Sequence, residues 1–103
     1  MTKKFHLYRS LKAGMQGEDV RKLQNWLNIV NSVYSFSERY PTGVPENGIF
    51  QTFILNVFYH EFLRWIGEPV NHVYDKYIHE SLCGEVNAAL LNLGDSGTTW
   101  TTK

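Results

Sequence analysis

The chain has only one cysteine, and it lacks several other features that define common protein classes. Cys83 has no second cysteine to pair with, so no disulfide forms within the chain, and we expect it to be half-buried near a helix end. No apolar run of about 18 residues occurs, so the sequence predicts no membrane-spanning helix. Residues 1–12 have no apolar stretch after their lysines, which predicts no secretory signal peptide. Localisation stays open, and a protein acting on the cell wall would arrive with a virion or by another non-secretory route.

The sequence also has no excess of positive or of negative charge. Lysine and arginine together number 10, aspartate and glutamate also number 10, and the net charge is zero with histidine neutral. Proteins that bind nucleic acid by neutralising phosphates carry a basic excess. No run of basic residues is longer than that of Lys3-Lys4. The composition therefore predicts neither a nucleic-acid partner nor a membrane partner.

Signatures of enzymes and metal sites are also absent. His60 and the glutamate after it resemble the start of a zinc-hydrolase helix, but the residue four positions on is Arg64 instead of histidine. His72 and His79 are possible further ligands, yet no local pattern gathers them. Cys83 follows His79 by four residues, and no motif supplies the oxyanion site that a Cys–His nucleophile needs. The sequence thus predicts no catalytic residue, no metal and no cofactor.

A well-marked helix start lies near the N-terminus. Gly14 and Gly17 allow the backbone angles of a tight turn, and two acids follow where a helix favours negative charge. The next apolar residues recur at spacings of three and four, which predicts an amphipathic helix over 18–30. They are Val20, Leu23, Leu27 and Val30. Trp26 lies off this stripe, and two interpretations stay open for it, a second core face or an exposed contact.

Helical periodicity continues further along the chain. A segment over 51–66 has so little polar surface that we expect a central, buried helix, with Phe58 and Phe62 inside and Gly67 at its end. A third helix is expected from about residue 75, interrupted at Gly84. A fourth helical stripe follows and ends at Gly94.

The expected fold class is all-α. Residues 1–94 are predicted to form one small three-helix bundle with an extra C-terminal helix and a short extended arm at the N-terminus. Residues 95–103 are expected to be a flexible tail. Residues 31–47 have the composition of a loop but carry aromatic residues, and a loop of this length inside a small domain is typically functional or mobile.

One eight-residue pattern occurs twice at an offset of 24 residues, over 47–54 and 71–78. Both copies read asparagine, any residue, a β-branched residue, an aromatic, two further residues, an aromatic and isoleucine. We interpret the copies as two turn-into-helix units, each of which places an aliphatic and an aromatic residue under the bundle.

Two of these segments resemble motifs of the peptidoglycan-binding-like domain family, small three-helix modules usually attached to cell-wall hydrolases and phage lysins. The first is Leu11-x-x-Gly14-x-x-Gly17-x-Asp19-Val20-x-x-Leu23-Gln24-x-x-Leu27-Asn28. The second is Asn47-Gly48-Ile49-Phe50, and Val73-Tyr74 with Leu82 matches more weakly. The resemblance spans about residues 10–82, and the family has a similar internal pseudo-repeat. Gln51 and Ile54 depart from the family pattern, which has glycine and threonine there, and the 31–47 segment is longer than is typical.

This resemblance implies a non-catalytic module that binds the glycan or the stem peptide of bacterial peptidoglycan. Such ligands present hydroxyls, amides and carboxylates, which aromatic faces and Asn or Arg side chains bind well. We expect the ligand-binding residues in the long loop, at its end and on the polar strip of the second helix. They are Tyr34, Phe36, Arg39, Tyr40, Asn47, His60 and Arg64.

A second hypothesis stays open. The same fold can serve a structural or adaptor protein, such as a component of a phage tail, a baseplate or a secretion machine, that docks onto a catalytic or virion protein. A net charge of zero and an aromatic share of 15% suit a docking surface. In this hypothesis Trp100, in the expected tail, is a candidate for insertion into a partner.

Overall fold

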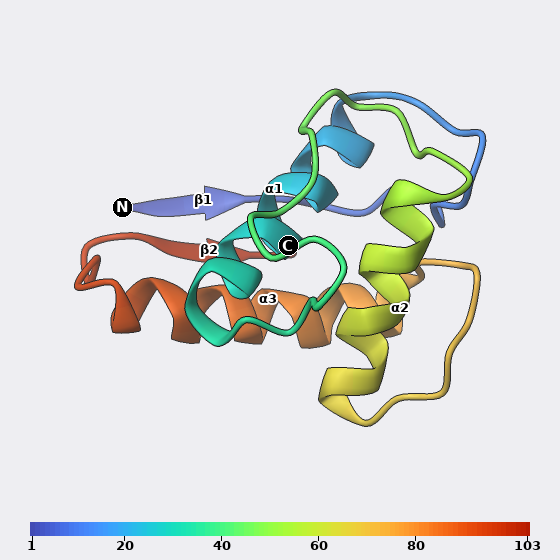
Figure 1. The fold of residues 1–103 in the computed structure, drawn as a ribbon. Coiled ribbons are helices and arrows are strands. Elements are labelled where there is room, and N and C mark those ends of the chain that lie inside the picture. The colour runs from blue at the N-terminus through green and yellow to red at the C-terminus, as the bar shows by residue number, and fades with distance from the viewer.

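The computed structural model describes residues 1–103 as three helices and a two-stranded parallel sheet (Figure 1). The elements are β1 (Thr2–Lys4), α1 (Glu18–Tyr34), α2 (Ile54–Ile66), α3 (Lys76–Asn92) and β2 (Thr99–Thr101). The strands lie side by side along α3, and α2 stands across one end of that helix (Figure 1). None of the helices has both the length and the apolar character that crossing a membrane requires.

The expected all-α class with a fourth helix is wrong in two respects. The chain contains the β1–β2 sheet, and α3 runs without interruption through Gly84. A helical glycine costs only about 1 kcal/mol relative to alanine. That cost is outweighed because Leu82 and Val86, on either side of it, are both fully buried. The two apolar stripes that we assigned to separate helices are therefore one stripe of a single helix.

The segment expected to be a flexible tail contains β2. Trp100 packs edge-on against Trp26 with ring centroids 5.3 Å apart, and its main-chain N–H donates to Asn87 Oδ1 at 2.7 Å. Thr102 is buried. The partner strand lies at the other end of the sequence, so no local pattern marks the pairing. Trp26 itself is fully buried, which assigns it to the core.

The core lies between α1 and the two other helices, α2 and α3. Phe58 and Phe62 of α2 are fully buried, as expected from the apolar character of that helix. Trp65, three residues after Phe62, is 39% exposed. It lies in the last turn of α2 and stacks on Tyr34 with ring centroids 5.1 Å apart.

The repeated pattern forms two similar corners. Phe50 and Tyr74 are buried at equivalent positions, and each exchanges backbone hydrogen bonds of 2.8–2.9 Å with the segment over 11–15. The prediction of a buried aromatic residue in each copy is confirmed. The aliphatic part is wrong for Ile49, which is 47% exposed.

Candidate functional site

The long segment between α1 and α2 is held in place by amide side chains of α1, beginning with Gln24. This fully buried side chain donates from Nε2 to the carbonyl oxygen of Ile49 at 2.9 Å and to Asn47 Oδ1 at 3.1 Å. Its Oε1 accepts from the N–H of Gly48 at 2.9 Å. One amide thus satisfies three polar groups of the turn before α2.

Asn28 and Asn31 continue this row at spacings of four and three residues, the spacing of one helix face. Asn28 donates to the carbonyl oxygen of Val44 at 2.8 Å and accepts from its N–H at 2.9 Å. Asn31 accepts from the N–H of Ser37 at 2.9 Å and donates to the carbonyl oxygen of Tyr40 at 3.2 Å. The loop is therefore tied to α1 at several points along its length.

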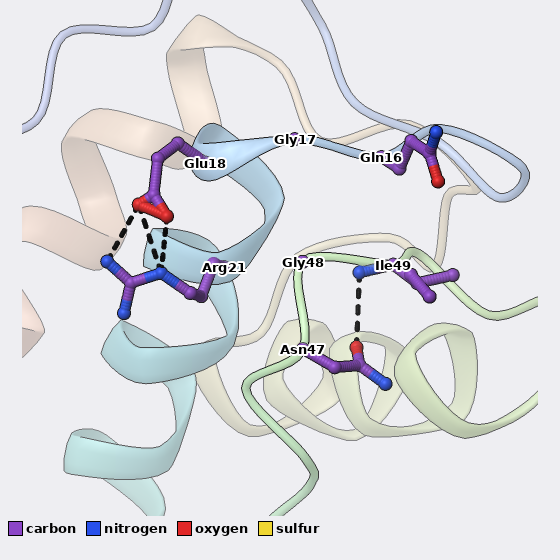
Figure 2. A pocket seen from close by; sticks show the side chains of 7 residues that line it. All are labelled: Gln16, Gly17, Glu18, Arg21, Asn47, Gly48 and Ile49. Atoms are coloured by element: carbon purple, nitrogen blue, oxygen red, sulfur yellow. Dashed lines mark hydrogen bonds and ion pairs between the residues drawn. The ribbon is translucent and has the colours of Figure 1, made fainter.

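The two stretches that resemble the wall-binding family meet at an open hollow of about 510 Å³ (Figure 2). The N–H of Gly17 donates to the carbonyl oxygen of Gly48 at 2.9 Å. The Arg21 guanidinium, hydrogen-bonded to Glu18, holds the pKa of that carboxyl below its usual range. Asn47 Oδ1 accepts from the N–H of Ile49 at 3.1 Å (Figure 2). These polar groups satisfy one another, so this hollow is a structural corner.

A different hollow, of about 410 Å³, lies between the loop and α2. Its lining residues are Glu38, Arg39, Val57, Glu61 and Arg64. Glu61 faces the loop: its carboxylate accepts from the hydroxyl of Ser37 at 2.5 Å and from the N–H groups of Glu38 and Arg39 at 2.9 and 3.3 Å. That carboxylate fixes the loop at the edge of the hollow.

The arginines of the chain divide into two kinds. Arg9 and Arg21 form ion pairs, with Asp19 and Glu18 respectively. Arg39 and Arg64, which both line the hollow beside α2, form no ion pair and no side-chain hydrogen bond.

One face of the Arg39 guanidinium is nevertheless in contact with an aromatic ring. Its central carbon lies 5.1 Å from the ring centroid of Phe53, a cation–π arrangement. Phe53 stands just before the first residue of α2 and is 53% exposed. Phe53 therefore adds an exposed apolar face next to the arginine.

The predicted aromatic site residues pack against the body of the protein. Phe36 is buried, with its ring centroid 5.0 Å from that of Phe58, and Tyr40 meets the edge of the same ring. Tyr34 is half-buried against Trp65. Of the seven residues predicted for ligand binding, the structure brings Arg39 and Arg64 to one hollow and gives these three aromatics packing contacts.

His60 lies apart from that hollow, against the loop that follows α2. Its ring centroid is 4.9 Å from that of His72, and its Nε2 is buried without a hydrogen-bond partner. Burial lowers the pKa of His60, and the proximity of His72 and Arg64 lowers it further. His79 is elsewhere in the core, and no three of the chain's histidine, cysteine and acidic side chains are grouped as metal ligands.

No protein-family model, curated protein or solved structure matches this chain. The resemblance to peptidoglycan-binding-like domains therefore rests on the motif residues alone, and membership of that family stays a prediction. What the structure adds to the motifs is their role: Gly17, Gln24, Asn47 and Gly48 build one corner of the fold.

The contact between Glu61 and the loop was not among the features predicted from the sequence. A signal was present, because Glu61 is the only acid in α2 and the loop after α1 carries three consecutive polar residues over 37–39. Consecutive main-chain N–H groups in such a loop bind an anion. Because Arg39 is one of those loop residues, pairing the loop with Glu61 would also have placed Arg39 beside α2.

Proposed function

We propose that this chain is a non-catalytic module that binds the peptide part of bacterial peptidoglycan at the hollow between the loop and α2. The observation that carries the proposal is that Arg39 and Arg64 line this hollow unpaired, whereas the other two arginines are in ion pairs. A guanidinium is a planar fork of N–H donors that matches a carboxylate. Two such groups at one hollow favour a ligand with free carboxylates.

The other lining groups suit a peptide of mixed charge. Glu38 is exposed and forms no ion pair, so it is free to accept from an amino group. The exposed ring of Phe53 offers an apolar face beside Arg39. Stem peptides of peptidoglycan carry carboxylates, amides and amino groups at short intervals. Both charge signs and an apolar face therefore have counterparts in this ligand.

The same geometry argues against hydrolysis at this hollow. Glycoside hydrolysis uses two carboxyl groups that flank the bond to be cleaved. Glu38 and Glu61 both line the hollow, but the carboxylate of Glu61 is engaged by three donors of the loop. One free acid remains, and we propose that the chain binds without catalysis.

A pull-down on purified sacculi tests this function. The wild-type chain is expected in the pellet, and the double variant Arg39→Ala/Arg64→Ala is expected to bind roughly tenfold or more weakly, since each lost arginine removes charge-assisted hydrogen bonds. Arg21→Ala is the matched control, because it removes the same charge from an ion pair outside the hollow. A wild-type chain left in the supernatant, or a double variant retained like the control, would contradict the proposal.

The adaptor function remains a second candidate, favoured by one observation. Leu91 and Leu93, at the end of α3, are 65% and 60% exposed. Exposed leucines of this kind occur at protein–protein contacts. If the chain co-purifies with virion or secretion-machine proteins and fails to bind sacculi, and if Leu91→Ser abolishes that co-purification, the adaptor function is supported instead.

A further inference from the structure

A hollow of about 430 Å³ lies where the two ends of the chain meet the start of α3. Three lysines line it, and they come from separate parts of the sequence. Lys4 ends β1, Lys76 begins α3, and Lys103 follows β2. The fold thus gathers a local positive charge that neither the net charge nor any run of basic residues indicates.

Two of the three lysines outside the hollow contact aromatic rings, unlike the three that line it. Lys3 lies over the ring of Trp100 at 5.5 Å, and Lys22 lies over the ring of Phe5 at 5.7 Å. Four lysines have no ion pair, no side-chain hydrogen bond and no aromatic contact, and three of these four line the hollow. Lys12, exposed on the turn before α1, is the fourth.

The remaining lining groups compensate this positive charge only in part. Glu80 is the one acidic side chain, and its carboxylate accepts from the hydroxyl of Thr102 at 2.6 Å. Three positive side chains face one negative side chain, and in the 103-residue chain the α-carboxylate of Lys103 adds a second negative charge, so a net positive charge remains. His6 donates from Nδ1 to the carbonyl oxygen of Thr102 at 3.0 Å, which fixes its ring on the wall, and the neighbouring Tyr8 is 85% exposed.

Lysine is a common ligand of phosphate groups in proteins. Its ammonium group is a compact point charge with three rotatable N–H donors, and it can approach a tetrahedral oxyanion from several directions. Three ammonium groups around one hollow suit a group with several charged oxygens. Concave surfaces lined by one sign of charge also raise the local concentration of the opposite ion.

We propose that the hollow lined by Lys4, Lys76 and Lys103 binds the phosphate group of a phosphorylated ligand. This site is separate from the hollow lined by Arg39 and Arg64, and the proposal does not depend on peptidoglycan binding. The shared chemistry is the phosphate itself, whether it belongs to a free phosphate or to a phosphodiester polymer. The two sources are separated by the ligands used in the test.

The test is a ¹H–¹⁵N NMR titration of the 103-residue chain with inorganic phosphate, with pyrophosphate and with a poly(glycerol phosphate). Saturable shifts are expected for the amides of Lys4, His6 and Lys76 in at least one of the three titrations. Tighter binding of the polymer identifies the phosphodiester source, and tighter binding of pyrophosphate identifies the free source. Sodium chloride at matched ionic strength should produce no saturable shift.

Variants separate this site from general charge effects. Lys4→Gln/Lys76→Gln is expected to weaken binding roughly tenfold, whereas Lys12→Gln, an unpaired lysine elsewhere, should leave it unchanged. All three positions are exposed, and a thermal melt checks that each variant stays folded. Absence of saturable shifts in the wild type, shifts reproduced by chloride, or equal effects of the double variant and Lys12→Gln would overturn the proposal.

Discussion

Asn47 and Asn71 make the same hydrogen bond at two corners of the fold. The side-chain oxygen of each accepts from the N–H two residues further on, at 3.1 Å for Asn47 and 2.7 Å for Asn71. The next residue in each copy, Phe50 or Tyr74, is buried and bridged by backbone hydrogen bonds to the segment over 11–15. The sequence repeat is therefore a repeat of turn geometry that leads into α2 and α3.

The repeat predicts different costs for the same substitution. Asn71→Ala should lower the free energy of unfolding by about 1 kcal/mol, the usual net value of one hydrogen bond. Asn47→Ala should cost more, because Asn47 Oδ1 also accepts from Gln24. Urea unfolding measures both. Asn71→Asp keeps the acceptor and should stay near the wild type, and a larger loss for Asn71→Ala than for Asn47→Ala would contradict this view of the corners.

Gln24 is expected to be one of the most sensitive polar positions. Gln24→Ala leaves the buried N–H of Gly48 and the carbonyl oxygen of Ile49 without their partner, which should cost about 2–3 kcal/mol. Gln16→Ala is the control, because Gln16 is exposed and its side chain forms no hydrogen bond with the protein. Denaturant midpoints that shift equally in the two variants would show that the amide does not hold the turn.

Two glycine substitutions should have opposite effects. Gly48 has φ +75°, and a Cβ there would lie 3.0 Å from the carbonyl oxygen of Gly17, so Gly48→Ala should destabilise by about 1–3 kcal/mol. Gly84 lies in α3 with open space around it, so Gly84→Ala should stabilise by up to about 1 kcal/mol. Thermal melts of both variants test this. A destabilised Gly84→Ala would contradict a continuous α3.

Acid should weaken the fold before its carboxylates titrate. Burial lowers the pKa of His79, whose ring nitrogens bond to Tyr74 and Phe5, and burial also lowers that of His60. Their contribution is complete above the unfolded value of about 6.5, and it is lost as the pH falls toward the lowered values because the unfolded chain then binds more protons. Urea unfolding between pH 7.5 and 5.5 should show falling stability, with a shallower slope in His79→Gln. A flat or rising profile would contradict this.

Local sequence signals predicted the parts of the fold that have local causes. The acidic start at Glu18 and the glycine stop at Gly67 mark the observed start of α1 and the end of α2. The β1–β2 pairing was missed because each strand has only three residues and the partners lie at opposite ends of the chain. The predicted interruption at Gly84 was wrong because the burial of neighbouring residues outweighs the low helix propensity of glycine.

The candidate site was predictable only in part. Residue type alone suggested Arg39 and Arg64, and the structure places both at one hollow. Type alone did not separate Phe36, which fills the core, from Phe53, which is exposed, because both are phenylalanines near α2. The distinction depends on which side of the loop faces the core. Hydrogen bonds from the loop to Glu61 and to the amide side chains of α1 fix that side.

The most direct test of the proposed function is an NMR titration with a soluble stem peptide that carries free carboxylates. The proposal predicts saturable shifts of the Arg39 and Arg64 side-chain resonances. It also predicts loss of binding in Arg39→Ala/Arg64→Ala and retained binding in Arg21→Ala. Shifts confined to other surfaces, or no saturable shift while the chain remains folded, would contradict it.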